Sequence, residues 1–353
     1  MDEATVLLRL LRRYSPSGAE GPAVAEFVRI ARTLGYAARV DGAGNGIARR
    51  GHGSPRILYL GHIDTVAGRR PVRRARGRVY GRGAVDAKGP LAAALVAGAT
   101  FSGPGTFEVA AAVGEEADSP GARYLTHRPA PTAVIAGEPS RWDGITVGYK
   151  GDLRVAARFR GRRTHYSSPH PTIADVALRW VEAVRALPPM APGPSPFRSV
   201  SVKVVGITTG GDDDEWAEVT IDVRLPPGRT TGELLRAFPA EPGRPHVRPL
   251  IRIEPIEVDR TNPVVRALEM AVRAEGGRPT LWRKSGTSDL NLVAPAWQVA
   301  GAAYGPGDPH LDHTSHEWVA ERELARSARV LRAAISQLSQ EFSSPSASAA
   351  HSP

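Results

Sequence analysis

Short apolar runs separated by polar or glycine-rich segments dominate the first 150 residues of the chain. Four of these runs have the length and the content of apolar residues that are typical of buried strands. They are residues 56–60, 106–113, 132–136 and 145–149. Apolar side chains at helical spacing predict a helix at residues 19–34, and a second helix is expected at 89–100. Strands that alternate with helices predict an α/β fold, with a central, mostly parallel sheet flanked by helices.

The rhythm changes near residue 151, where the order becomes strand, helix, two long alternating strands, helix and strand. This order predicts an inserted ferredoxin-like α+β lid domain over residues 151–257. The α/β pattern then resumes with a helix, two strands and a final helix, at residues 263–275, 279–283, 297–301 and 320–338. We therefore expect a discontinuous catalytic domain formed by residues 1–150 and 258–340. Residues 341–353 are rich in Ser and Ala and are expected to form a disordered tail.

Polar clusters follow three of the first four predicted strands. His62 and Asp64 follow the first strand, Glu115 and Glu116 the second, and Glu138 the third. In an open α/β sheet, ligands bind beyond the carboxyl ends of the strands. We therefore expect these side chains to meet in one crevice. Because His62 and Asp64 are two residues apart, the carboxylate can orient the imidazole of a metal ligand.

Each of these residues also has an ordinary structural explanation. Asp86 stands at the start of a predicted helix, where an N-cap is the simpler interpretation. Ion pairs with arginine would account for Glu115, Glu116 and Glu138. Adjacent carboxylates at a buried strand end repel each other, however, and therefore favour a cation nearby.

Composition narrows the chemistry of such a site. The 353-residue chain has no cysteine, which excludes disulfides, thiolate catalysis and sulfur-bound metals. A metal would be held by His, Asp and Glu alone. The formal net charge of +10 favours an acidic partner. Only four of the 46 basic residues are lysines, and Lys88, Lys150 and Lys284 all lie inside sequence motifs, which suggests a need for a compact ammonium there.

Two kinds of partner are not expected. No apolar run approaches the roughly 20 residues that a membrane helix needs, and the N-terminus is acidic at once, unlike a secretory signal. The basic residues lack interleaved aromatic residues and any known nucleic-acid motif. We therefore expect a cytoplasmic protein that binds neither membrane nor nucleic acid.

Four motifs that occur in order at suitable spacing point to a known family. They are Gly61-His62-Ile63-Asp64-Thr65-Val66, Gly81-Arg82-Gly83-Ala84-Val85-Asp86-Ala87-Lys88-Gly89, Gly114-Glu115-Glu116 and Gly137-Glu138-Pro139-Ser140. The chain resembles the co-catalytic zinc hydrolase family of acetylornithine deacetylase, succinyl-diaminopimelate desuccinylase, aminoacylase and carboxypeptidase G, from residue 1 to about 335. This resemblance implies a hydrolase of linear amides that binds two divalent metal ions. Zinc is the first choice for these ions, and cobalt and manganese are the alternatives.

The resemblance also implies which residues bind the two metals. His62 and Glu138 would bind one ion, and Glu116 and His313 the other. Asp86 would bridge the two ions.

Two further roles, and the choice of the last ligand, follow from the same resemblance. Asp64 would orient His62, and Glu115 would be the general base. The segment Asp312-His313-Thr314-Ser315-His316-Glu317 offers two histidines. The family places a glutamate four residues after the ligand, which selects His313, with Glu317, over His316.

The predicted lid domain carries a further candidate. His165 resembles the lid histidine of the family, which reaches the active site of a neighbouring subunit and polarises the scissile carbonyl, although an ordinary loop histidine is the alternative. The resemblance implies a homodimer through the lid domain. Arg224 and a turn resemble the elements that grip the substrate carboxylate. The residues of this turn are Lys284, Ser285, Gly286 and Thr287. For Arg224, a solvated strand position is nearly as good an interpretation.

Four longer stretches narrow the resemblance to one branch of the family. They are residues 83–91, 137–145, 148–151 and 304–308. The branch releases lysine or ornithine, in lysine and arginine biosynthesis, from the terminal Glu of LysW, a small acidic amino-group carrier protein. Trp318 departs from it, since a histidine usually follows the glutamate at this position. One alternative is a deacylase of free N-acyl amino acids such as acetyl-lysine, acetylornithine or succinyl-diaminopimelate.

A different class of function is a non-catalytic binding protein on the same scaffold. Retention of Asp64, Glu115 and all five candidate ligands argues against it, because a protein without catalysis has no need for clustered carboxylates. Six arginines lie between residues 69 and 78, between the His62 and Asp86 motifs. They either dock the acidic carrier or form a solvated loop.

Overall fold

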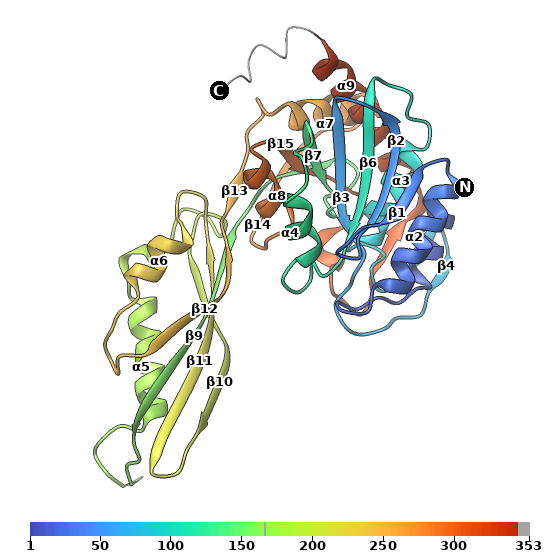
Figure 1. Cartoon of the computed structure of the whole chain (residues 1–353). Coiled ribbons are helices and arrows are strands. Elements are labelled where there is room, and N and C mark those ends of the chain that lie inside the picture. Colours follow the sequence, from blue (N-terminus) through green and yellow to red (C-terminus); the bar gives the residue numbers. More distant parts are fainter. Residues whose placement is uncertain (166, 345–353) are drawn as a thin grey trace. The chain divides into compact units, whose positions relative to one another are not determined.

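The computed structural model describes residues 1–165 and 167–344, and its chain forms two compact units (Figure 1). Unit 1 consists of Met1–Val147, Val258–Trp282 and, among the described residues, 288–344. Unit 2 consists of Gly148–Glu257 and Arg283–Thr287. The sequence predicts Arg283–Thr287 in the catalytic domain, whereas the structure groups this segment with unit 2. No helix in the described part of the chain is long and apolar enough to cross a membrane.

The larger sheet has nine strands, in the order β1-β2-β6-β3-β7-β15-β8-β13, with β14 paired to β8. The bounds are β1 (Ala37–Val40), β2 (Gly46–His52), β3 (Arg56–His62), β6 (Gly105–Ala112), β7 (Ala133–Ala136), β8 (Gly144–Tyr149), β13 (Ile256–Glu257), β14 (Thr280–Lys284) and β15 (Ala300–Ala303). The inner strands β6, β3, β7 and β15 run parallel to their neighbours in this order. Antiparallel pairs flank them on both sides. The predicted α/β fold is confirmed.

Helices cover this sheet (Figure 1). They are α1 (Glu3–Leu11), α2 (Gly21–Thr33), α3 (Lys88–Gly98), α4 (Pro120–Thr126), α7 (Pro263–Ala274), α8 (Leu290–Trp297) and α9 (Glu321–Ser343). Helix α3 packs between α1, α9 and the strands, and nearly all of its residues are buried. Its alanines and glycines leave room for this close approach of neighbouring backbones. Thus the helix that follows Asp86 is held on several sides.

Helices α1 and α4 have no counterpart in the prediction, and α8 and α9 also differ from it. Helix α8 was not expected, because its apolar sequence LNLVAPAW contains Pro295, which disfavours a helix interior. It packs on α4 and β15, and this burial outweighs the local preference. Helix α9 continues to Ser343, beyond the predicted end at 338 and into the expected tail. Residues 345–353 of that tail lie outside the described residues.

A smaller sheet joins the arginine-rich segment to the C-terminal part of unit 1. Its antiparallel strands are β4 (Arg73–Ala75), β5 (Arg78–Tyr80) and β16 (Trp318–Ala320), in the order β16-β5-β4. Trp318 lies opposite Tyr80 in the register. Because β16 follows Glu317 directly, this pairing brings the end of the His313 segment beside the loop that leads to Asp86.

Unit 2 has the predicted ferredoxin-like order. Its elements are β9 (Gly151–Arg162), α5 (Ile173–Arg185), the 3-10 turn η1 (Pro188–Met190), β10 (Ser201–Gly210), β11 (Asp214–Leu225), α6 (Thr231–Ala237) and β12 (His246–Ile253). The antiparallel sheet has the order β10-β11-β9-β12, as βαββαβ domains of this class require. Trp180 of α5 is buried and meets Phe159 and Phe238 edge to face. These contacts anchor the helices to one face of the sheet.

Candidate metal centre

The predicted polar clusters lie at one edge of the larger sheet. Strand β3 pairs in parallel with β6 on one side and with β7 on the other. Their carboxyl ends therefore share an edge. His62 is the last residue of β3, Glu115 and Glu116 follow β6, and Glu138 follows β7. The expected convergence depends on this strand order, which brings together clusters that are far apart in the sequence.

Five side chains form two overlapping groups of potential metal ligands. One group contains His62, Asp86 and Glu138, and the other contains Asp86, Glu116 and His313, with the ligand atoms of each group within 4.8 Å of one another. His62 Nε2 lies 3.0 Å from Asp86 Oδ1. His313 Nε2 lies 3.0 Å from Asp86 Oδ2 and 3.0 Å from Glu116 Oε1. The two oxygens of Asp86 therefore face the two imidazoles, one in each group.

The ordinary explanations for these carboxylates do not fit the structure. The N-cap of α3 is Ala87, with no side-chain capping hydrogen bond, so Asp86 does not cap the helix. Within the described residues, neither Glu115 nor Glu116 forms an ion pair with arginine, and the partner of Glu116 is His313. The carboxylates of Asp86 and Glu116 are thus directed toward the two histidines.

Asp64 holds two parts of the centre together. His62 Nδ1 lies 3.1 Å from the Asp64 carbonyl oxygen and 3.3 Å from Asp64 Oδ1, which leaves Nε2 to face Asp86. The Asp64 carboxylate also accepts hydrogen bonds from the backbone N–H groups of Glu115 and Glu116, both at 3.1 Å. Ser17 Oγ donates to the same carboxylate at 2.7 Å. Asp64 is fully buried, so these bonds fix both His62 and the Glu115–Glu116 turn.

Glu317 supports the loop that carries Asp86. Its buried carboxylate accepts hydrogen bonds from the backbone N–H groups of Gly83, Val85 and Asp86, at 3.0, 2.9 and 3.2 Å. Arg82 Nη1 donates to it at 2.9 Å. The family pattern drew attention to Glu317 as the partner of His313 in sequence, but not to this contact. The geometry shows a carboxylate that satisfies three backbone donors of one loop.

Lys88 anchors the other end of this loop. Its side chain is buried, and Nζ donates to the carbonyl oxygens of Arg13 at 2.8 Å and Leu10 at 3.4 Å. These carbonyl groups lie at the end of α1, where a helix leaves carbonyl oxygens without partners. Burial lowers the pKa of Lys88 to about 7, and Glu317 opposes that change. The compact ammonium group of Lys88 therefore fits between the start of α3 and the end of α1. This agrees with the prediction that the few lysines of the chain stand where a compact ammonium is needed.

The carboxylates of the centre differ in proton affinity. Burial raises the pKa of Glu115 well above its ordinary value; His62 opposes this shift and Glu138 reinforces it. Burial would also raise the pKa of Asp86, but hydrogen bonds from His313 and His62 outweigh it and lower that pKa. Glu115 is therefore the carboxylate with the stronger tendency to take up a proton, as a general base requires.

His313 lies in an unusual backbone conformation. Its φ is 60°, in the left-handed region that non-glycine residues seldom adopt. Hydrogen bonds to Asp86 and Glu116 raise the pKa of its imidazole to about 10. The same carboxylates attract any cation. His316 is exposed and its backbone N–H bonds Thr314, so the structure places His313, and not His316, in the ligand group.

The donor set fits divalent metals. Imidazole nitrogens and carboxylate oxygens, without sulfur, suit zinc and related ions. Each group offers three protein ligands, which leaves a position for water or substrate, as catalytic sites require. Together with a neighbouring buried glutamate, this arrangement defines a metal-dependent hydrolase.

Comparison with known proteins gives the family. The chain belongs to peptidase family M20/M25/M40, whose model matches residues 58–337. A Deinococcus radiodurans protein named LysW-lysine hydrolase is 36% identical over 341 residues, covering 90% of this chain and 92% of that protein. A Sulfurisphaera tokodaii protein named LysW-lysine/LysW-ornithine hydrolase is 31% identical, covering 90% of both. A Thermococcus kodakarensis relative, provisionally given the same name, is 37% identical, and the match covers 96% of this chain and 92% of that protein.

Solved structures share the fold. A tripeptidase from Staphylococcus aureus superposes with a TM-score of 0.79 at 18% identity, covering 96% of this chain and 98% of its own. An M20 family metallo-carboxypeptidase from Sulfolobus solfataricus gives a TM-score of 0.77 at 15% identity, covering 96% and 100%. At this level of identity the likeness concerns the architecture alone.

The remaining predicted site residues belong to unit 2. His165 is exposed in the loop after β9, and its Nδ1 lies 2.7 Å from Ser167 Oγ. Lys284 lies at the end of β14, and Ser285, Gly286 and Thr287 follow it. Arg224 lies in β11, where its Nε and Nη2 donate to the two oxygens of Asp222 at 2.8 and 3.1 Å. This edge of the guanidinium is therefore already occupied by a carboxylate of its own strand.

Proposed function

We propose that the chain is a dinuclear-metal amide hydrolase that releases lysine or ornithine from the terminal Glu of an acidic amino-group carrier protein, in lysine or arginine biosynthesis. The observation that carries the chemistry is the pair of ligand groups that share Asp86. The observation that favours this substrate is the name shared by relatives that match nearly the whole chain, LysW-lysine or LysW-ornithine hydrolase.

Each ligand group would hold one divalent ion. His62 and Glu138 would complete one site, Glu116 and His313 the other, and Asp86 would contribute one oxygen to each. When bound, two such ions activate water and polarise the scissile carbonyl, and zinc, cobalt and manganese all suit these ligands. Asp64 and Glu317 keep the ligands in place through the hydrogen bonds described above.

Glu115 would transfer the proton. Its carboxylate takes a proton from the water whose oxygen attacks the amide carbon, and the bond between this carbon and the amine nitrogen then breaks. The same proton passes to the departing amine, so Glu115 is restored. Burial raises the pKa of Glu115 despite the opposing effect of His62, and this favours the cycle because proton uptake becomes easier than for an exposed glutamate.

His165 would act on the carbonyl oxygen. As an exposed imidazole in the loop after β9, it can donate a hydrogen bond to the developing oxyanion once the lid covers a site. We propose that this site belongs to the partner in a homodimer. Arg224 and the turn of Lys284, Ser285, Gly286 and Thr287 would bind the substrate carboxylate. For this, Arg224 must engage a carboxylate beyond Asp222 and Asp152, with which it already pairs.

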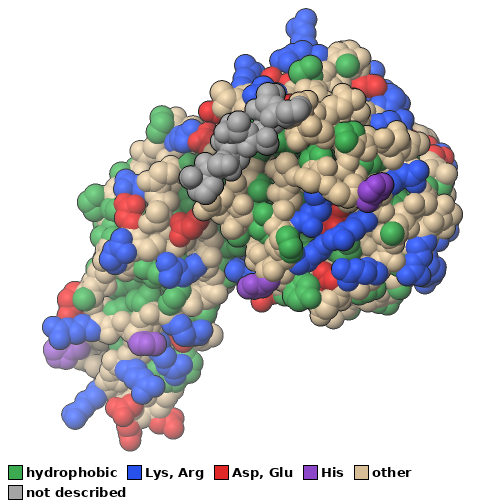
Figure 2. Space-filling view, turned by 45° about the horizontal axis from the view of Figure 1, so that its top comes forward, with side chains coloured by type: hydrophobic (Ala, Val, Ile, Leu, Met, Phe, Trp, Pro, Cys, Tyr) green, Lys and Arg blue, Asp and Glu red, His purple; other side chains and the backbone are tan. Residues whose placement is uncertain are grey.

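The charge of the protein supports an acidic macromolecular substrate. The net charge is +10, and basic side chains are spread over the face shown in Figure 2. The main alternative is a deacylase of free N-acyl amino acids, which has no need of this charge. A non-catalytic binding protein would require neither the shared Asp86 nor the buried Glu115.

Hydrolysis of carrier-linked substrate beside free substrates tests the proposal. Purified protein is given LysW-linked lysine, LysW-linked ornithine, N-acetyl-lysine, N-acetylornithine and succinyl-diaminopimelate, and the kcat/KM for each is measured at low and high salt. We expect the highest kcat/KM for a carrier-linked amide, with a steep decrease as salt rises, because the screening length falls from about 10 Å at 0.1 M to about 3 Å at 1 M. A higher kcat/KM for a free acyl amino acid, insensitive to salt, would establish the deacylase instead.

A further inference from the structure

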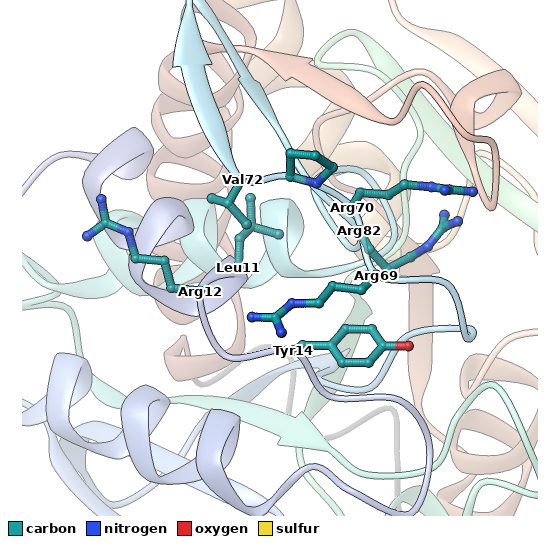
Figure 3. A pocket seen from close by; sticks show the side chains of 8 residues that line it. Leu11, Arg12, Tyr14, Arg69, Arg70, Val72 and Arg82 are labelled. Carbon is teal, nitrogen blue, oxygen red and sulfur yellow. The ribbon is translucent and has the colours of Figure 1, made fainter.

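A basic pocket lies beside the two segments that lead to the metal ligands His62 and Asp86. Its cavity has a volume of about 230 Å³, and Figure 3 shows the side chains that line it. The lining residues are Leu11, Arg12, Tyr14, Arg69, Arg70, Pro71, Val72 and Arg82. Four of them are arginines and none is acidic.

The arginines of the 69–78 segment differ in their surroundings. Arg74 forms a bidentate ion pair with Glu321, in which Nε donates to Oε1 at 2.8 Å and Nη2 donates to Oε2 at 2.6 Å. Arg73 lies over the ring of Tyr80, and Arg78 lies over the ring of Trp318, with 3.7 and 3.8 Å from guanidinium carbon to ring centre. These three arginines stabilise the small sheet. Arg69 and Arg70 instead line the pocket.

The pocket contains hydrogen-bond donors that lack acceptors. Arg70 Nε is buried without a hydrogen-bond partner. The hydroxyl of Tyr14 accepts from the backbone N–H of Gly68 at 3.0 Å, which leaves its own proton free to be donated. Within the described residues, Arg12, Arg69 and Arg70 form no ion pair with a carboxylate. A buried donor without an acceptor is costly, so a ligand that accepts hydrogen bonds would be favoured here.

Two of the guanidinium groups flank the same point of the backbone. A Cβ atom placed on Gly68 would lie 3.7 Å from Arg82 Nη2 and 3.9 Å from Arg70 Nη2. Arg82 is buried, and its Nη1 donates to Glu317 at 2.9 Å while its Nε donates to the carbonyl oxygen of Gly68 at 3.3 Å. An anion placed beside this point of the backbone would therefore lie near two positively charged groups at once. The planar, multiple donors of arginine match a carboxylate in particular.

The position of the pocket connects it to the catalytic residues. Arg69 and Arg70 follow β3 and the segment of His62 and Asp64, while Arg82 precedes Asp86 by four positions. Arg82 contacts Glu317, whose carboxylate in turn accepts from the Asp86 N–H. An anion in the pocket would therefore bind on the same two segments that position the metal ligands.

We propose that this pocket binds carboxylate side chains of an acidic polypeptide. The proposal rests on the proposed function, since it names the surface by which an acidic protein substrate is held. A cavity of about 230 Å³ is smaller than the roughly 300–1,000 Å³ typical of sites that enclose a small molecule. The cavity has room for one or two carboxylate groups that a bound polypeptide inserts from the solvent. The guanidinium and hydroxyl donors that line it all suit a carboxylate.

Binding of a defined acidic peptide tests the pocket without any turnover. Fluorescein-labelled hexaglutamate is titrated with the full-length protein at low salt, and fluorescence anisotropy gives the Kd. We compare the double variant Arg69→Gln/Arg70→Gln with a matched double variant, Arg39→Gln/Arg278→Gln. Arg39 and Arg278 are exposed, and neither forms an ion pair in the part of the chain that the structure describes. Both variants therefore lose two positive charges, but only one loses the pocket.

We expect the pocket variant to weaken binding by about tenfold or more, which corresponds to the loss of roughly one charge-assisted hydrogen bond, and the matched variant by about twofold at most. The variant Arg69→Lys/Arg70→Lys should recover part of the affinity, because lysine keeps the positive charge but lacks the planar, multiple donors of the guanidinium group. Should the Gln variant unfold, Tyr14→Phe removes a single donor and is expected to weaken binding as well. Equal losses in the two double variants would overturn the proposal.

A competition experiment separates a polypeptide site from a site for small anions. Inorganic phosphate is added to the hexaglutamate complex, with sodium chloride at equal ionic strength as the control. Phosphate should displace the peptide no better than chloride does; displacement at low phosphate concentration would overturn the polypeptide site. Failure of the pocket is distinguishable from failure of the proposed function. Hydrolysis of carrier-linked lysine with equal KM in both double variants would reject the pocket alone, whereas pocket-dependent peptide binding without hydrolysis would reject the proposed function alone.

Discussion

The carboxylate of Glu317 accepts a hydrogen bond from the backbone N–H of Asp86 at 3.2 Å, although 231 positions separate these residues. We expect Glu317→Gln to loosen the Asp86 loop, because one oxygen acceptor is replaced by an amide that faces backbone donors and Arg82. Breaking a buried ion pair of this kind typically costs about 3 to 5 kcal/mol. The variant should therefore release metal to a chelator more easily and unfold at lower denaturant concentration.

Glu321→Gln provides the control for this prediction. Glu321 pairs with Arg74 on the surface, where solvent screens the attraction and such a pair contributes little to stability. Both substitutions replace a glutamate carboxylate with an amide, at positions four residues apart. Equal effects on chelator sensitivity and unfolding would show that Glu317 has no special role in the centre.

Metal content should depend on how the ligands are shared. Because Asp86 belongs to both ligand groups and Glu138 to one, Asp86→Ala should weaken both metal sites, whereas Glu138→Ala should weaken one. We expect about two divalent ions per chain in the unaltered protein by elemental analysis, and loss of activity after chelation. Full activity in protein that contains no metal would exclude the mechanism.

Glu115→Gln should remove turnover and leave metal content unchanged. Glu115 is outside both ligand groups, but its carboxylate is buried beside them and has a raised pKa. Loss of a general base typically lowers the rate by about 10² to 10⁴. Parallel measurement of kcat and bound metal checks this prediction, and a near-normal kcat would assign the proton transfer to another group.

Asp289 should make stability depend on pH. Its side chain is buried, Oδ1 has no hydrogen-bond partner, and burial raises its pKa from 3.8 to about 6. The folded state then binds the proton more tightly than the unfolded state. Ionisation of Asp289 therefore destabilises the fold progressively as the pH rises from about 4, and the full penalty, up to about 3 kcal/mol, is reached above about pH 6.

Asp289→Asn removes this ionisation. In chelator-treated protein, where no cation alters the local field, we expect the variant to be more stable than the unaltered chain at pH 8 and to have no such advantage below pH 4. Urea unfolding at both pH values measures the difference. A difference in stability that is the same at both pH values would rule out the titration of Asp289 as its cause.

The proposed homodimer can be tested by complementation. His165 lies in unit 2 and Glu115 in unit 1. In the same unit as His165, the edge strand β10 exposes Val204, Val205 and Ile207, an apolar surface that a second copy of the chain would cover. If His165 serves the partner's site, mixed dimers of His165→Ala and Glu115→Gln chains regain one complete site. Demonstrated subunit exchange without recovery of activity would place His165 and Glu115 of one chain in the same site.

The sequence was most informative where chemistry and local pattern coincide. The strands before His62, Glu115 and Glu138 are short, apolar and buried on both faces, so their positions follow from the residues alone. Helix α8 was missed because Pro295 lowers the local preference for a helix that packing then restores. The small sheet was missed because its strands are only three residues long and because β16 pairs with β5 across a wide gap in sequence.

The sequence by itself determined the α/β architecture and indicated the candidate ligands and their order along the chain, because periodicity and residue chemistry are local properties. Only the tertiary structure decided which groups support those ligands. The bonds from Ser17 to Asp64, from Lys88 to the end of α1 and from the Asp86 loop to Glu317 join segments far apart in the chain. The same holds for the basic pocket, in which Arg12 and Tyr14 meet Arg69 and Arg70. Such partners are chosen by the packing of helices on the sheet, and the spacing of residues along the chain carries no trace of that choice.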